Sequence, residues 1–66
     1  MRKATIGENA GKIYRHLEGN GSATAAKIKK DLSMDTADMN MALGWLAREH
    51  KITFNKKGSS VSISLS

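Results

Sequence analysis

The sequence predicts a small α+β domain in which three helices precede a two-stranded antiparallel hairpin. Before residue 50, apolar residues recur at helical spacing in three separate segments. From Ile52 onward the period changes to two, and a turn at residues 56–59 divides two alternating runs. A chain of 66 residues has room for one hydrophobic core, so we expect residues 1–66 to form a single domain.

The first helix is predicted over residues 6–18. Thr5 and Glu8 form a capping box, in which each side chain accepts a hydrogen bond from the backbone amide of the other residue. Residues 19–21, Gly-Asn-Gly, can adopt left-handed conformations and end the helix. Its apolar face is expected to contain Ile6, Ala10, Ile13, Tyr14 and Leu17.

Two glycines, Gly7 and Gly11, lie inside this helix four residues apart. Each weakens a helix by about 1 kcal/mol relative to alanine. Two interpretations remain open at the level of sequence. The glycines either let another backbone approach the helix closely or are tolerated at an exposed surface.

The second and third helices are predicted over residues 25–32 and 36–49. Thr24 and Asp35 are suitable N-caps, and Asp38 adds negative charge to the first turn of the third helix. Residues 22–23 have room only for a minimal strand, and residues 33–34 form a tight link. The expected core faces contain Ala25, Ile28 and Leu32 in the second helix, and Met39, Ala42, Leu43 and Leu46 in the third.

The hairpin has one apolar face and one polar face. Ile52 and Phe54 alternate with polar residues before the turn, and Val61, Ile63 and Leu65 alternate with serines after it. An isolated hairpin is marginally stable in water, so the apolar face must pack on the helices.

This order of elements is that of a winged helix-turn-helix domain. The segment Ala42-Leu43-Gly44-Trp45-Leu46-Ala47-Arg48-Glu49, continuing into Lys51-Ile52, resembles the small stand-alone winged-helix domains of bacteria and archaea whose biological role is uncharacterised. The run Gly7-Glu8-Asn9-Ala10-Gly11, near the start of the first helix, also resembles a feature that recurs in that group. His50 departs from the resemblance, because related sequences more often carry Gly or Asp there. The resemblance implies the fold but no single function, since winged helices contact DNA, RNA and proteins alike.

A net charge of +5 makes a polyanion the first partner to consider, and DNA is the favoured one. In winged-helix regulators the third helix enters the major groove, while the second helix and the hairpin contact phosphates. Arg2 and Lys3 are candidates for a basic arm. Any single lysine is better explained by solubility, so the prediction requires that the cations converge on one face. The residues expected to contact nucleic acid are Lys27, Lys30, Thr36, Asn40, Lys56 and Lys57.

The distribution of charge argues against strong sequence reading by the third helix. The net charge is +5 over residues 1–30, −3 over residues 31–47 and +3 over residues 48–66. Asp35 and Asp38 stabilise the start of the third helix but repel a duplex. Asn40 is suited to a bidentate contact with adenine, and Thr36 to a phosphate or base. We therefore expect weak duplex binding of low sequence specificity.

A second hypothesis assigns the outward face of the third helix to protein recognition or homodimerisation. Its residues are Met41, Gly44, Trp45 and Arg48. Trp and Met are enriched at protein interfaces, and an exposed glycine permits close approach. The competing interpretation places Trp45 under the hairpin, packed on Phe54 or Ile63 and completing the core.

The sequence carries none of the patterns associated with catalysis or metal binding. It contains no cysteine, and His16 and His50 lack ligand-like neighbours, so we expect both to be surface or helix-end residues. The Lys57-Gly58-Ser59 turn lacks the upstream glycine of a P-loop. We expect no enzyme activity, no metal, no cofactor and no small-molecule substrate.

The start of the chain does not resemble a targeting signal. No run of about seven apolar residues follows the basic start, and no stretch approaches the roughly 20 that span a bilayer. We therefore expect no membrane segment and a cytoplasmic location.

Overall fold

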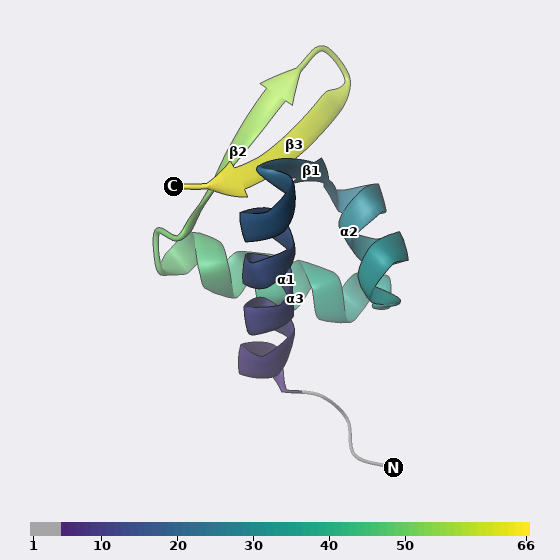
Figure 1. Cartoon of the computed structure of the whole chain (residues 1–66), viewed down its shortest axis with the longest axis vertical. Helices are drawn as coiled ribbons and strands as arrows, with labels where there is room; N and C mark the ends of the chain where they lie inside the picture. The colour runs from purple at the N-terminus through teal and green to yellow at the C-terminus, as the bar shows by residue number, and fades with distance from the viewer. Residues whose placement is uncertain (1–4) are drawn as a thin grey trace.

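The computed structural model describes residues 5–66; the basic arm predicted at Arg2 and Lys3 lies outside them. The elements follow in the order α1 (Ile6–Asn20), β1 (Ser22–Thr24), α2 (Ala25–Leu32), α3 (Thr36–Arg48), β2 (Ile52–Lys57) and β3 (Ser60–Leu65). Figure 1 shows α1 crossing α3, α2 to one side, and the β2–β3 hairpin projecting from the helices. The predicted α+β fold, with three helices and a C-terminal hairpin, is confirmed.

The capping signals lie where the sequence predicts them. The Thr5 hydroxyl accepts a hydrogen bond from the Glu8 amide, and Thr24 and Asp35 accept equivalent bonds from the amides of Lys27 and Asp38. These contacts satisfy amides that a helix start leaves without intrahelical acceptors.

The C-terminal end of α1 differs from the prediction. The helix continues two residues past Glu18 to Asn20, whose side-chain amide donates to the His16 carbonyl at 2.8 Å. Of the glycines in this turn only Gly21 has a positive φ, 81°. Its amide donates to the Leu17 carbonyl and closes the helix.

The ends of α2 and α3 share one geometry. Ser33 and His50 adopt left-handed backbone angles, with φ of 52° and 58°. At α2, the Ser33 amide donates to the Lys30 carbonyl and the Met34 amide to the Lys29 carbonyl. The equivalent bonds after α3 run from His50 to Ala47 and from Lys51 to Leu46. Both ends are Schellman motifs without glycine, and the predicted α3 boundary at Glu49 is one residue too long.

The sheet has the order β1-β3-β2, with all pairs antiparallel. The minimal strand predicted at residues 22–23 is confirmed as β1, in which Ala23 pairs with Ile63. The hairpin turn is tighter than predicted, because Lys56 and Lys57 continue β2 and only residues 58–59 form the loop. Gly58 has a φ of 61°, as the first position of a type II′ turn requires.

One apolar cluster joins the three helices to the sheet. Four side chains at its centre are essentially inaccessible: Ile13, Leu17, Ile28 and Ile63. Met34, predicted to be part of a link, is buried as well. Three residues assigned to apolar faces are exposed instead, namely Ile6 at the start of α1, Phe54 on the edge strand β2, and Val61 near the turn end of β3.

Candidate nucleic-acid interface

Helix α3 presents two polar residues from its first turns to solvent. Thr36 and Asn40 are both exposed and lie four residues apart, so they share one side of the helix. Asp35 caps this end of α3 by accepting a hydrogen bond from the Asp38 amide at 2.8 Å. Two acidic residues therefore stand beside the residues that would read bases, and no basic residue occurs in α3 before Arg48.

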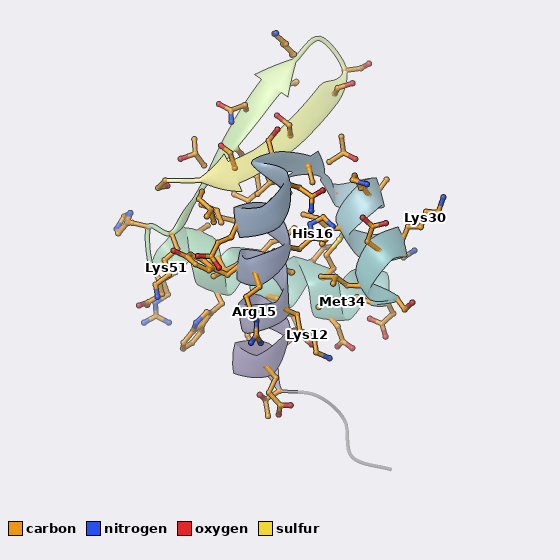
Figure 2. All side chains as sticks on the ribbon, in the orientation of Figure 1. Lys12, Arg15, His16, Lys30, Met34 and Lys51 are labelled. Atoms are coloured by element: carbon orange, nitrogen blue, oxygen red, sulfur yellow. The ribbon has the colours of Figure 1, made fainter. Side chains whose placement is uncertain are left out.

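The two lysines predicted for α2 differ in their surroundings. Lys27 Nζ lies 3.1 Å from Asp31 Oδ2, one helical turn away, and its side chain is half-exposed. Lys30 extends from α2 into solvent (Figure 2). Within residues 5–66 no carboxylate pairs with Lys30. Lys30 is thus the freer cation for a phosphate, while the charge of Lys27 is partly offset.

The prediction that His16 is a surface residue is wrong. Its side chain is only 8% exposed and links α1 to α2 through a 2.9 Å contact between Nε2 and Asp31 Oδ2. The hydrogen bond from His16, followed by that from Lys27, lowers the pKa of Asp31 below 3.8. His16 Nδ1 is buried without a partner in the part of the chain that the structure describes. The 15-residue separation of His16 from Asp31 gives no local signal of this contact.

The hairpin, hereafter the wing, carries the other two predicted lysines. Lys56 pairs with Val61 and Lys57 with Ser60, so their side chains start from opposite faces of β2. Both nevertheless line one hollow of about 520 Å³ along the edge strand, with Phe54, Asn55 and Ser62. Neither lysine has a carboxylate partner among residues 5–66. Phe54, which is 49% exposed, is a member of this surface that sequence reasoning assigned to the core.

The residues predicted for a protein interface form an exposed strip on α3. Met41 is 53% and Trp45 is 45% exposed, and Arg48 is exposed. A Cβ at Gly44 would meet no atom within 4 Å, so the chain itself does not require glycine there. Trp45 lies beside Gly7 and Ala10 of α1 rather than under the wing. The interpretation that Trp45 completes the core against Phe54 or Ile63 is therefore wrong.

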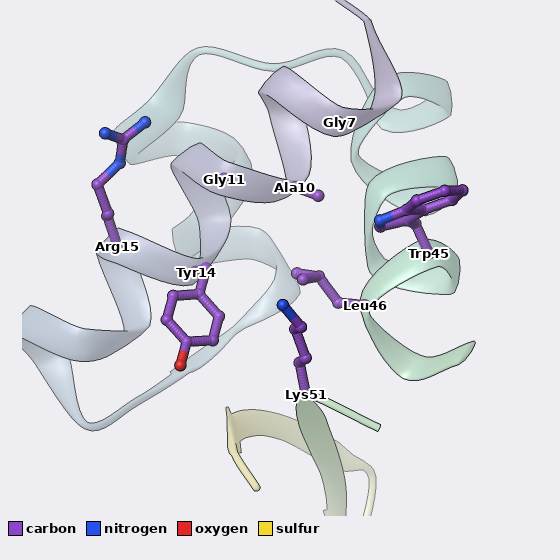
Figure 3. Close-up of a pocket in the computed structure, with 8 residues that line it drawn as sticks. All are labelled: Gly7, Ala10, Gly11, Tyr14, Arg15, Trp45, Leu46 and Lys51. Atoms are coloured by element: carbon purple, nitrogen blue, oxygen red, sulfur yellow. The ribbon is translucent and has the colours of Figure 1, made fainter. Parts of the chain in front are cut away.

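A groove of about 340 Å³ runs between α1 and the C-terminal half of α3 (Figure 3). The Lys51 ammonium lies 5.9 Å from the centroid of the Tyr14 ring, within cation–π range. Sequence reasoning singled out Gly7, Gly11 and Trp45 but not the groove they share, because its residues come from three separate segments. The groove is lined by Gly7, Ala10, Gly11, Tyr14, Arg15, Trp45, Leu46 and Lys51.

Residues 5–66 contain no cluster of three or more side chains able to hold a metal ion. None of the helices described is long and apolar enough to cross a membrane.

Three helices, a three-stranded antiparallel sheet and a projecting wing define a winged helix-turn-helix domain, a fold that commonly binds DNA and is typical of non-enzymatic proteins. A family model described as a winged helix-turn-helix domain (DUF2582) matches residues 1–65, and the chain belongs to this family. Uncharacterized protein MJ1608 of Methanocaldococcus jannaschii is 52% identical over 50 residues, which span 71% of this chain and 70% of the relative.

Three solved structures show the same fold. Protein BT2368 from Bacteroides thetaiotaomicron has a TM-score of 0.83 at 27% identity, over 91% of this chain and 73% of that one. Reduced HlyU from Vibrio cholerae has a TM-score of 0.81 at 20% identity, over 89% and 61% of the two chains. The Zalpha domain of PKZ from Carassius auratus, solved in complex with Z-DNA, has a TM-score of 0.81 at 24% identity, over 96% and 100%.

Proposed function

We propose that this protein binds duplex DNA weakly and with low sequence specificity, through its wing and α2. The observation that carries the proposal is the pair of exposed, unpaired lysines Lys56 and Lys57 on the projecting wing. Lys30 and Lys27 supply further cations from α2. A similarly folded domain is bound to Z-DNA in its solved structure, which supports a nucleic-acid role for this architecture.

Low specificity follows from the surface of α3. Thr36 and Asn40 are its exposed polar residues near the helix start, and Asp35 and Asp38 place negative charge beside them. Only Asn40 is suited to reading a base by two hydrogen bonds. Phosphate contacts from lysines position a protein on a duplex but carry no sequence information directly.

The test is a titration of fluorescently labelled mixed-sequence duplex at several salt concentrations. Each phosphate neutralised by a lysine contributes about 0.9 to the slope of log K against log salt. Lys56→Gln combined with Lys57→Gln should weaken binding and reduce that slope by about 2. Asn40→Ala should change the affinity for different sequences by similar small factors.

A matched control separates local contacts from total charge. Lys12→Gln combined with Arg15→Gln removes two charges from α1, at a distance from the wing (Figure 2). This control should leave the salt slope unchanged. Equal losses from the wing and control variants would show attraction to overall charge alone and contradict the proposed surface.

A second candidate function is protein association through α3. It is favoured by the exposure of Met41 and Trp45, and by Gly44, where an added Cβ would meet no atom within 4 Å. Under this hypothesis Met41→Glu and Trp45→Ala change the molar mass measured by light scattering, while the wing variants do not. A monomer at all concentrations, with DNA binding intact in Met41→Glu, would reject it.

A further inference from the structure

Gly7 and Gly11 have no packing role inside the chain. A Cβ at Gly7 would lie 3.9 Å from the Thr5 hydroxyl oxygen, and one at Gly11 would lie 3.7 Å from an Arg15 nitrogen. Both are ordinary van der Waals distances, so alanine fits at either position and would strengthen the helix. No backbone of another segment approaches these sites within the part of the chain described. The space beside the glycines opens into the groove between α1 and α3.

Two aromatic side chains border this groove. Trp45 stands on the α3 side, with its indole nitrogen turned toward Ala10, and Tyr14 stands on the α1 side (Figure 3). The indole N–H has no hydrogen-bond acceptor among residues 5–66. The floor between the aromatics is formed by Ala10 and Leu46, which are buried members of the core. A flat apolar ligand in this groove would have an aromatic ring on either side and the side chains of Ala10 and Leu46 beneath it.

The polar lining of the groove is cationic. Arg15 and Lys51 are the charged residues that line it, and no Asp or Glu side chain does. Neither cation has a carboxylate partner in the described residues. The Lys51 ammonium and the free indole N–H, with the positive charge of Arg15 at the far rim, complement a carboxylate better than a neutral polar group.

From these observations we propose that the groove between α1 and α3 binds a small planar aromatic carboxylate. Its volume of about 340 Å³ lies within the range of small-molecule sites, roughly 300–1,000 Å³. The ring lies along Gly7 and Gly11 and against Trp45, and the carboxylate lies near the Lys51 ammonium, while Arg15, whose guanidinium points away from Lys51 in Figure 3, adds positive charge at the far rim of the groove. The site is separate from the wing surface and does not depend on DNA binding.

The probe for the test is 2-naphthoate, compared with 2-naphthamide, which has the same ring without charge, and cyclohexanecarboxylate, which has the charge without an aromatic ring. Trp45 is the one tryptophan in the chain, so its indole N–H gives a single NMR cross-peak at the site. We expect 2-naphthoate to shift that peak saturably and to bind at least about tenfold more tightly than either control compound.

Two variants test the geometry. Gly7→Ala combined with Gly11→Ala should raise Tm, because both sites accept a Cβ, and should weaken 2-naphthoate binding at least about tenfold by filling the groove. Arg15→Gln combined with Lys51→Gln should reduce the affinity for 2-naphthoate to that for 2-naphthamide. Lys56→Gln combined with Lys57→Gln, with the same loss of charge on the wing, should leave 2-naphthoate binding unchanged.

Several results would overturn the proposal. One is equal binding of the acid and the amide; another is an unshifted indole peak at about 5 mM 2-naphthoate. If the glycine variant instead changes the molar mass and the probe does not bind, the groove is an interface between two copies of the chain. A glycine variant that is more stable and binds 2-naphthoate normally would show that the glycines are surface positions without a ligand.

Discussion

Replacing His50 by glycine should stabilise the protein through the backbone alone. His50 has a φ of 58° between α3 and β2, its side chain is exposed, and its amide donates to the Ala47 carbonyl. A left-handed conformation costs a residue with a Cβ about 1–2 kcal/mol, while glycine loses about 0.5–1 kcal/mol more conformational entropy on folding. The expected net gain for His50→Gly is therefore about 0.5–1 kcal/mol.

Thermal unfolding followed by circular dichroism measures this gain. In a domain of this size 1 kcal/mol shifts Tm by about 4–8 °C, so His50→Gly should raise Tm by about 2–8 °C. His50→Ala retains the left-handed cost and is the matched control, which should show no such rise. Ser33→Gly, at the equivalent position after α2, should repeat the gain. A Tm rise of equal size in the alanine variant would refute the backbone explanation and implicate the histidine side chain.

The remaining predictions concern the ion pair, a helix cap and the core. The pKa of Asp31 is lowered in the folded state, so the ionised carboxylate stabilises the fold above pH 3.8, and this stabilisation is lost as pH falls below 3.8. Asp31→Asn should therefore remove this part of the pH dependence of Tm. Asp35→Ala should cost about 1 kcal/mol in denaturant unfolding, because the Asp38 amide loses its acceptor. Ile28→Ala, at a fully buried site, should cost about 2–5 kcal/mol and leave little folded protein at 37 °C by the same assay.

The elements could be predicted from the sequence because their signals are local. Thr5, Thr24 and Asp35 each precede a run of helical spacing, and each caps the helix expected from it. The change to period two at Ile52 likewise identified the wing. The helix ends were less accurate, since Ser33 and His50 close Schellman motifs without the glycine that usually indicates one.

The contacts between elements could not be predicted in the same way. The sequence around His16 in α1 predicts a surface residue. Its side chain is buried because α2 packs beside α1 and brings Asp31 into contact with it. Phe54 has the same strand parity as Ile52 and lies opposite the buried Ile63, yet it is 49% exposed on the edge strand β2. Strand parity does not tell how much of an edge strand the helices cover. The placement of Trp45 against α1 depends on how two helices cross, which periodicity does not encode.

Two pairs of cations line two different hollows of the structure, and this makes the two proposals separable. Lys56 and Lys57 lie on the wing, whereas Arg15 and Lys51 border the groove between α1 and α3. Exposed charges separated by more than roughly 8–10 Å are largely screened at physiological salt, so each pair should act on its own ligand. Wing variants should then affect only DNA, and groove variants only the aromatic acid. Loss of both activities in either variant would mean that one surface binds both ligands, because a purely local loss of charge cannot produce that result.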